Sequence, residues 1–307
     1  MARREVHRCH DTSRYCPPTV QDIALAVDIG GTKLAVGRVD ADGAVLAHAT
    51  VTTAGDGSLW DRLAALVDQV RRGDEVVCGV GCGGPMRPGG ETVSPLNIAE
   101  WRDFPLRDRL ARHLDLPTAV DNDAKALALG EGWRGSAAGV DDFVAMVVST
   151  GVGGGIVLDG RLLDGDGSNA GHIGHVIVEP DGRRCACGGQ VCLEAEASGT
   201  AIAAVTGRPA AEAPIEVRQR CGTMVGRAVA SVVNLLDLHL AVVAGSVALG
   251  YGDVFFAAAN AELTARSRIE FAHGARILPA GLGSNGPLVG AAAVGFRSVG
   301  LAGLADR

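Results

Sequence analysis

The chain has 307 residues, of which 47% are hydrophobic and 21% are charged. This composition is typical of a soluble globular protein of one or two domains, and it excludes disordered, collagen-like and coiled-coil chains. The net charge of −7 argues against broad electrostatic binding to nucleic acid or to an anionic membrane surface. Glycine is the outlier, with 44 residues against a usual share of about 7%.

The N-terminal segment favours a cytoplasmic protein. Residues 1–22 are basic and polar, contain Pro17-Pro18 near their end, and lack the apolar core of a secretory signal. The chain also has no run of about 18 apolar residues that would form a transmembrane helix. We therefore expect a flexible extension over 1–22 and reduced cysteines.

Apolar runs alternate with amphipathic segments along the chain. Strands are expected at 23–29, 34–39, 76–80, 118–120, 143–148, 156–158, 240–244 and 276–280. Helices are expected at 58–72, around Leu106, Leu110 and Leu114, and at 124–133, 217–236 and 287–299. The alternation predicts an α/β protein with parallel or mixed central sheets.

A pattern of strand, glycine turn and strand occurs twice. The first copy turns at Gly30-Gly31, and the second, about 120 residues later, turns at Ser149–Gly155. The repeat predicts a duplicated fold with two related lobes that face a cleft. We place an N-terminal lobe at 23–121 plus 287–307, and a C-terminal lobe at 122–286.

The first glycine turn, Asp28-Ile29-Gly30-Gly31-Thr32-Lys33, has the residues of a phosphate site. Glycines allow backbone N–H groups to approach a polyphosphate, and Thr32 and Lys33 add a hydroxyl group and a positive charge. Asp28 is a candidate to hold hydrated Mg²⁺. A simple β-hairpin turn is the alternative interpretation.

The second glycine run, Ser149–Gly155, strengthens the phosphate interpretation, because two turns at corresponding places could bind one phosphate chain from both sides. Both turns run from strand to strand, which is unlike a dinucleotide-binding fold. The chain has no Gly-Lys-Ser/Thr motif, and this excludes a P-loop.

Asp121-Asn122-Asp123 follows a short strand and opens a helix. One carboxylate could be a general base, with Asn122 binding a hydroxyl group. A helix N-cap is the alternative. The residues by themselves do not choose between Asp121 and Asp123.

A metal site is the most specific signal. His175, Cys185, Cys187 and Cys192 lie close together in sequence, with the spacing of a tetrahedral structural Zn²⁺ site. Such a closed site builds structure rather than activating water. The other five cysteines (Cys9, Cys16, Cys78, Cys82 and Cys221) have no metal spacing and are expected to be free thiols.

Together, five motifs resemble the ROK family (repressors, open reading frames, kinases), within the larger superfamily of sugar kinases, heat-shock chaperones and actin. The motifs, in order, are Asp-Ile-Gly-Gly-Thr-Lys, Asn-Asp, Thr-Gly-Val-Gly-Gly-Gly, Gly-His and Cys-x-Cys-Gly-x-x-x-Cys-x-Glu, and they cover the chain from residue 23. The resemblance implies two actin-like, ribonuclease H-like lobes, with ATP and a sugar in the cleft between them and a zinc-bound loop.

The resemblance also implies a role for each matching residue. Asp123 matches the catalytic base, and His175 would direct one ring nitrogen to Zn²⁺ and the other to the sugar. The implied substrate-binding residues are Gly84, Asn97, Asn122, Asp123, His172, His175 and Glu194. The implied ATP-binding residues are Asp28, Gly30, Gly31, Thr32, Lys33, Thr150, Gly151, Gly153, Gly154, Gly245 and Ser246.

Three positions depart from the family pattern. His172 replaces a Glu that accepts hydrogen bonds from hydroxyl groups near C1 and C2 of the sugar, and a histidine can donate as well as accept. Val191 replaces a usual Gly before the last cysteine. Lys125 replaces a frequent Asn, and we expect it on the surface of its helix.

The implied activity is ATP- and Mg²⁺-dependent phosphorylation of a hexose or hexose-like substrate at the 6-hydroxyl group. Glucose is the common choice in the family, and His172 prompts an amino sugar (N-acetylmannosamine or kanosamine) or a cyclitol as the alternative. The expected partners are a small-molecule sugar and a second copy of the chain, without nucleic acid or membrane.

A non-catalytic, sugar-sensing regulator is the competing class. Regulators of the family carry a helix-turn-helix segment ahead of the first glycine motif. The 22 residues that precede the motif here, with two prolines, are too few for such a segment, and the acidic balance also disfavours DNA.

Overall fold

The computed structural model describes residues 22–301, so nearly all of the extension expected over 1–22 lies outside the described residues, together with Cys9 and Cys16. The chain divides into two units. The first contains the described residues up to Trp133 and from Pro287 onward, and the second spans Arg134–Gly286. The first unit therefore includes the helix after Asn122, which the sequence analysis assigned to the second lobe.

The first unit is built on a mixed five-stranded sheet of order β3-β2-β1-β4-β5. β1 pairs antiparallel with β2 and parallel with β4; β2 also pairs antiparallel with β3, and β4 parallel with β5. The strands are β1 (Ile23–Ile29), β2 (Lys33–Asp40), β3 (Val45–Thr52), β4 (Val77–Cys82) and β5 (Thr118–Asn122).

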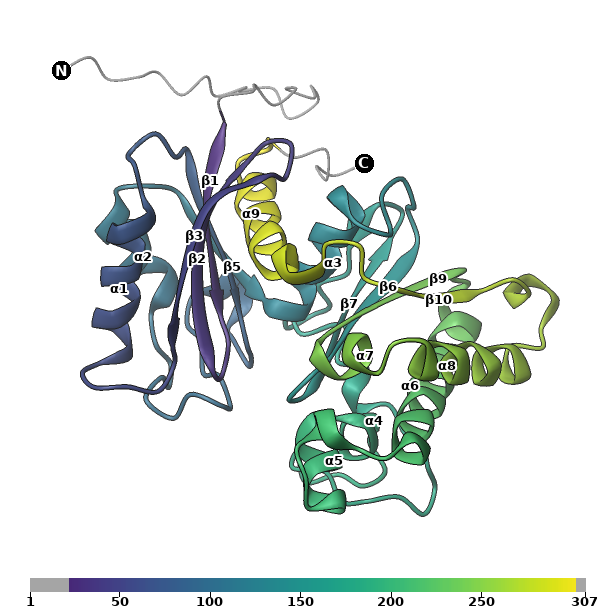
Figure 1. The fold of residues 1–307 in the computed structure, drawn as a ribbon. Helices are drawn as coiled ribbons and strands as arrows, with labels where there is room; N and C mark the ends of the chain where they lie inside the picture. The colour runs from purple at the N-terminus through teal and green to yellow at the C-terminus, as the bar shows by residue number, and fades with distance from the viewer. Residues whose placement is uncertain (1–21, 302–307) are drawn as a thin grey trace. The chain divides into compact units, whose positions relative to one another are not determined.

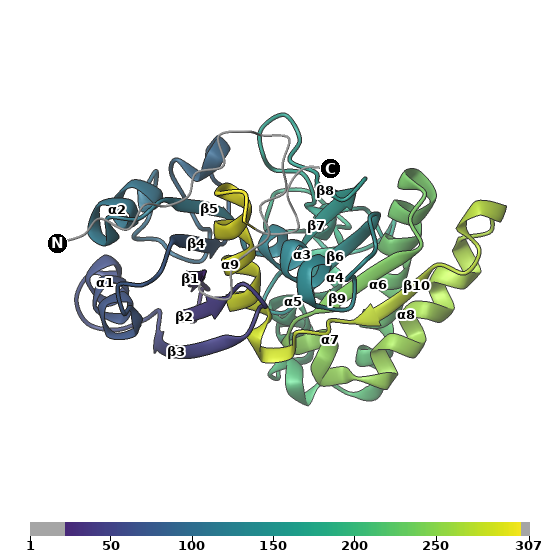
Figure 2. The same ribbon diagram turned by 90° about the horizontal axis from the view of Figure 1, so that it is seen from above.

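Helices cover both faces of this sheet (Figures 1 and 2). α1 (Leu59–Val70) and α2 (Leu106–Leu114) bury their leucines against one face, where Leu25, Val27 and Ile29 of β1 point. α9 (Gly286–Ser298) covers the opposite face, to which Ala24 and Ala26 belong. The alternation of side chains along β1 thus decides which helix each residue contacts.

α9 approaches the sheet and its neighbouring helix α3 (Asp123–Arg134) closely because both sides lack side chains. A Cβ atom on Gly290 would lie 2.5 Å from the carbonyl oxygen of Ala126 in α3. At the end of α3, the Trp133 ring meets the Phe296 ring edge to face, with centroids 5.6 Å apart. These contacts tie α3 to the first unit. The remaining described helix of this unit is the short 3-10 turn η1 (Pro88–Gly90).

The second unit repeats the sheet of the first. Its strand order is β10-β9-β6-β7-β8, and the central strand β6 pairs antiparallel with β7 and parallel with β9. The repeat predicted from the two glycine turns is therefore confirmed in the sheet topology. The strands are β6 (Phe143–Val148), β7 (Val152–Leu158), β8 (Arg161–Leu162), β9 (Leu240–Ala244) and β10 (Arg276–Pro279).

Helices α6 (Ile215–Leu236) and α8 (Asp253–Arg266) are the long helices of the second unit, and they pack on each other. A Cβ atom on Gly226 of α6 would lie 2.2 Å from the carbonyl oxygen of Ala259 in α8, so the glycine permits this close approach. The shorter elements are η2 (Ile173–His175), α4 (Leu193–Ala197), α5 (Gly199–Thr206), η3 (Ala210–Glu212), α7 (Ser246–Tyr251), η4 (Glu270–Ala272) and η5 (Gly283–Asn285).

The second glycine turn is shorter than the sequence predicted. β7 begins at Val152, and Gly153, Gly154 and Gly155 pair with Val147, Met146 and Ala145 of β6. The turn itself is limited to Ser149–Gly151. The expectation of a turn through Gly155 was wrong, because strand pairing overrides the weak preference of glycine for strands.

Within residues 22–301, no helix combines the length and the apolar character needed to cross a membrane.

We predict that Gly79→Ala destabilises the first unit. The new Cβ atom would lie 1.9 Å from the carbonyl oxygen of Ala291 and 2.6 Å from the amide nitrogen of Gly295, both on α9. We expect a loss of about 3 kcal/mol in the free energy of unfolding, because neither backbone can yield without displacing α9. Urea denaturation followed by tryptophan fluorescence measures it.

Gly83→Ala is the matched control, because a Cβ atom there would meet only Cβ of Pro95, at 4.0 Å. A Gly79→Ala variant that is as stable as the control would contradict the close packing of α9 on β4.

Candidate functional site

The parallel strands of the first unit bring the predicted acidic residues to one edge of the sheet. Asp28 of β1 lies beside Gly81 of β4, and Gly81 lies beside Asp121 of β5. Because β5 runs directly into α3, Asp123 follows at the same edge. A Cβ atom on Gly81 would lie 3.7 Å from Cα of Asp123 and 4.0 Å from Oδ1 of Asp28, so this glycine lies between the two acids.

The two acids influence each other electrostatically. Burial and, to a smaller extent, the charge of Asp123 raise the pKa of Asp28 to about 7, and the charge of Lys33 partly opposes them. Burial raises the pKa of the neighbouring Cys82 thiol as well, with contributions from Asp123 and Asp28. Two oxygen donors that disfavour each other's charge fit a hard divalent cation such as Mg²⁺, which would relieve this repulsion.

Thr53 fixes the first glycine turn through two hydrogen bonds. Its hydroxyl group donates to the carbonyl oxygen of Gly30 at 2.7 Å, and its amide donates to the carbonyl oxygen of Thr32 at 2.9 Å. Gly31, Thr32 and Lys33 are exposed. The sequence analysis missed Thr53, which lies outside every motif.

Asn97 lies beside the first glycine turn, and Gly84 lies beside Asn122 of the Asn-Asp pair. A Cβ atom on Gly31 would lie 2.9 Å from Cβ of Asn97, and one on Gly84 would lie 3.5 Å from Nδ2 of Asn122. The amide of Leu96 donates to the carbonyl oxygen of Gly84 at 3.3 Å, which joins the two loop segments. The first unit therefore brings all of its predicted ATP- and sugar-binding residues to one edge.

Asp121 and Asp123 have different surroundings. Asp121 Oδ1 accepts from the Asn122 amide at 2.8 Å and pairs with Nζ of Lys125 at 3.1 Å. Asp123 is exposed, and its Oδ1 accepts from the Ala124 amide at 2.8 Å. Asn122 Oδ1 accepts from the same amide at 3.0 Å, so Asn122 is the residue of this segment that caps the N-terminus of α3.

Lys125 corrects an expectation. It was expected on the helix surface, but its side chain is only 2% exposed. The sequence shows the charge of Lys125 but not the partner that allows its burial, which is Asp121 one helical turn earlier.

The turn at the start of β7 contains the predicted residues Thr150 and Gly151. The carbonyl oxygen of Thr150 accepts from both the amide (3.2 Å) and the hydroxyl group (2.9 Å) of Thr200, a residue that the sequence analysis missed. Ser149 Oγ lies 3.0 Å from Ser246 Oγ, which joins this turn to the predicted Gly245-Ser246 pair. Gly245 has φ +101°, and a Cβ atom there would lie 2.3 Å from the carbonyl oxygen of Val148.

Gly153 and Gly154 lie in the strand rather than in the turn. A Cβ atom on Gly154 would lie 2.8 Å from Cγ2 of Ile173 and 3.0 Å from the carbonyl oxygen of Gly171. This glycine therefore makes room for the segment that carries His172.

The predicted sugar ligands of the second unit lie around this segment. Glu194 Oε2 accepts from the Val152 amide at 2.9 Å, which fixes its carboxylate beside the turn. His172 is exposed, and its Nδ1 lies 2.8 Å from the carbonyl oxygen of Asn169. A carbonyl oxygen only accepts, so Nδ1 of His172 carries the proton and Nε2 of a neutral ring is an acceptor. The rings of His172 and His175 stack, with centroids 6.1 Å apart.

The four predicted metal ligands cluster. Their ligand atoms, from His175, Cys185, Cys187 and Cys192, all lie within 4.8 Å of one another. Cys185 Sγ is 3.8 Å from His175 Nδ1, and Cys187 Sγ is 3.9 Å from Cys192 Sγ. Ligands on a tetrahedron with Zn–S bonds of about 2.3 Å stand ~3.8 Å apart, so this donor set fits Zn²⁺.

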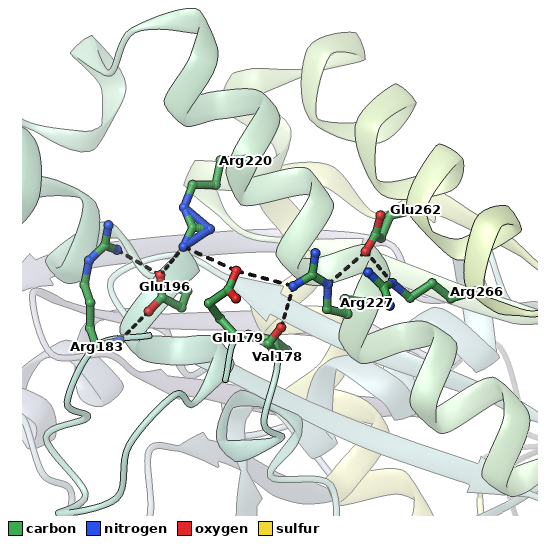
Figure 3. Close-up of polar contacts among 8 residues, drawn as sticks. All are labelled: Val178, Glu179, Arg183, Glu196, Arg220, Arg227, Glu262 and Arg266. Carbon is green, nitrogen blue, oxygen red and sulfur yellow. Dashed lines mark hydrogen bonds and ion pairs between the residues drawn. The ribbon is translucent and has the colours of Figure 1, made fainter. Parts of the chain in front are cut away.

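A network of arginine and glutamate side chains connects segments of the second unit that are far apart in sequence (Figure 3). It includes Glu196 of α4, which is 3% exposed and pairs with Arg183 and Arg220. The sequence analysis missed this network, because its members come from separate segments and share no motif.

A model of the ROK family matches residues 24–296. Glucokinase of Thermotoga maritima is 40% identical over 183 residues, which span 58% of this chain and 58% of that protein. N-acetylmannosamine kinase of Escherichia fergusonii is 36% identical over 247 residues, which span 74% of this chain and 84% of that protein.

Among solved structures, a ROK family glucokinase from Streptomyces griseus in complex with glucose and AMPPNP has the same fold. It matches with a TM-score of 0.78 at 30% identity, over 89% of this chain and 99% of that one.

We predict that Asp28→Asn makes the protein more stable above neutral pH. The pKa of Asp28 is about 7 in the folded chain and near 3.8 in the unfolded chain. Stability from the protonated carboxyl group is therefore full below pH 4 and is lost as the pH rises to about 7. Relative to wild type, the free energy of unfolding of the variant should rise by about 4 kcal/mol between pH 4 and pH 8.

Urea denaturation at pH 4, 6 and 8 in EDTA measures this gain, and Asp56→Asn, at an exposed position, is the control. A gap between variant and wild type that does not change with pH would refute the raised pKa of Asp28.

Proposed function

The chain belongs to the ROK family, and from that premise we propose that it transfers the γ-phosphoryl group of ATP to the 6-hydroxyl group of a hexose or hexose-like sugar. ATP-dependent sugar kinase activity is what its glucokinase and N-acetylmannosamine kinase relatives share. The observation that carries the proposal is the exposed carboxylate of Asp123 beside the partly buried Asp28, at the sheet edge that also holds the Gly30-Gly31 turn.

Asp123 is the general base. Its carboxylate accepts the proton of the sugar hydroxyl group while the oxygen attacks the γ-phosphorus, a new P–O bond forms, and ADP leaves. Asp121 does not suit this role, because its carboxylate is held by Lys125 and by the Asn122 amide. Asn122, Asn97 and Gly84 line the same edge and bind sugar hydroxyl groups.

The Gly30-Gly31 turn and Lys33 bind phosphate. The exposed backbone of the turn can approach phosphate oxygens, and Lys33 adds a positive charge. Asp28 would hold Mg²⁺ through its hydration shell. When bound, Mg²⁺ neutralises part of the negative charge of the phosphate chain.

In the second unit, the proposed phosphate-binding residues are Thr150, Gly151, Gly153 and Gly154, and the proposed adenosine-binding residues are Gly245 and Ser246.

Three residues of this unit bind the sugar. Glu194 accepts from its hydroxyl groups. His175 has its Nδ1 atom on the metal side, which leaves Nε2 for a hydroxyl group. His172 offers a single acceptor, Nε2.

The metal is structural in this proposal. His175, Cys185, Cys187 and Cys192 would hold Zn²⁺, and a site with four protein ligands has no open position for water. When bound, Zn²⁺ fixes the chain around the His175 ring and the start of α4.

We predict that Asp123→Asn lowers kcat by about 10³-fold, because the amide cannot accept the proton. A coupled ADP assay with a sugar panel measures it, and circular dichroism verifies the fold. Asp121→Asn is the discriminating control: it should lose stability yet keep kcat within about tenfold. If Asp121→Asn lost the activity and Asp123→Asn kept it, the assignment of the base would be reversed.

We predict that His172→Glu shifts the substrate preference toward glucose. A carboxylate offers two acceptor oxygens to the hydroxyl groups near C1 and C2, whereas neutral His172 offers only Nε2. The ratio of kcat/KM for glucose over N-acetylmannosamine should rise about tenfold, the value of one charged hydrogen bond. An unchanged ratio would exclude His172 from sugar recognition.

A further inference from the structure

Val191, immediately before the metal ligand Cys192, has a backbone conformation that disfavours its side chain. Its φ is +63°, in the left-handed region, where a β-branched residue is strained. The amide of Val191 donates to the carbonyl oxygen of Arg183 at 2.8 Å, and the Val178 amide donates to the carbonyl oxygen of Val191 at 3.1 Å. The strained conformation therefore depends on where Val178 and Arg183 are held.

Arg183 is held by the carboxylate of Glu196. Glu196 Oε1 accepts from the Arg183 amide at 2.7 Å, and Oε2 lies 3.2 Å from the Arg183 guanidinium. Oε2 also accepts from Arg220 of α6 at 2.8 Å (Figure 3). The Glu196 side chain is fully buried, and Gly182 leaves the room it needs, since a Cβ atom there would lie 2.6 Å from Oε1.

Val178 is held by the other half of the network. Its carbonyl oxygen accepts from Nη1 of Arg227 on α6 at 2.7 Å, and the same guanidinium pairs with Glu262 of α8 at 2.8 Å. Burial raises the pKa of Glu262, but Arg227 and Arg266 outweigh it and lower the pKa, so this carboxylate stays charged. Both anchors of Val191 are thus fixed to the long helices of the second unit (Figure 3).

We propose that Glu196 is a positioning residue for the metal loop. Through Arg183 it holds Val191 in its left-handed conformation, which keeps Cys192 and the other ligands close together before Zn²⁺ binds. This inference rests on the Zn²⁺ site of the proposed function. A loop that is already ordered loses less entropy on binding, so the network raises the affinity for the metal.

Glu196→Gln tests the proposal, because Gln keeps the size of the side chain but has only one acceptor oxygen. Its NH2 group must face either the Arg183 amide or the two guanidinium groups, all of which are donors. In the full-length protein, the apparent dissociation constant for Zn²⁺, measured by competition with a chromogenic chelator, should rise about tenfold. Should this variant not accumulate, Arg220→Gln removes one partner only and should raise the constant about threefold. Zinc affinity equal to wild type in the tested variant would overturn the proposal.

Glu75→Gln is the matched control for a merely structural loss. Glu75 is a buried carboxylate of the first unit that also accepts from backbone amides, of Arg72 at 2.9 Å and of Gly73 at 2.8 Å, and from Arg38 at 2.7 Å. The control should lower the melting temperature comparably while leaving the zinc affinity unchanged. An equal loss of zinc affinity in both variants would overturn a positioning role.

Val191→Gly tests the link through the strained residue, because glycine adopts positive φ freely. In this background Glu196→Gln should weaken zinc binding by less than about threefold, since the loop no longer needs to be held. The same tenfold loss in both backgrounds would overturn that link.

The zinc content and sugar kinase activity of the wild-type protein are measured on the same preparation. Wild-type protein that binds no zinc would overturn the metal site and this inference together. Intact activity with zinc affinity insensitive to Glu196 would overturn this inference alone.

Discussion

The parallel pairing of β1, β4 and β5 places the carboxylates of Asp28 and Asp123 at one sheet edge, where the charge of Asp123 disfavours that of Asp28. Burial and the charge of Asp123 keep the pKa of Asp28 near neutrality, and Lys33 only partly compensates. Two neighbouring carboxylates lower the stability of the protein when no cation is bound, and binding of a cation or a proton relieves this loss. In the proposed function, the stability lost here would return as binding energy for Mg²⁺.

The second unit repeats the sheet of the first but has a different anchor. In place of paired carboxylates it has a four-ligand cluster, held by a strained valine and a buried glutamate. The cluster precedes α4, where Glu194 accepts from the Val152 amide. Because Val152 starts β7 directly after the glycine turn, the metal loop and the turn share one hydrogen-bonded connection. The geometry of the proposed sugar ligands thus depends on the loop.

Hydrophobic periodicity predicted most of the strands of the two sheets and the main helices that pack on them. The spacing of the cysteines and His175 predicted the cluster of candidate metal ligands. The edge strand Val45–Thr52 was not predicted, because two of the four residues on its partly buried face are alanines, which have a weak preference for strands. Helix α8 was missed because its alanine-rich sequence lacks an apolar periodicity. Lys125 and Glu196 show the general limit: the sequence contains their charges, but their burial depends on partners that only the fold brings close.

The first unit is assembled from both ends of the chain, and this has a consequence for biosynthesis. The second unit is continuous in sequence, so it can fold as soon as Gly286 has left the ribosome. The alanine-lined face of the first sheet stays uncovered until α9, which follows the second unit in sequence, packs against Gly79. The nascent chain therefore exposes this apolar surface throughout the synthesis of the second unit.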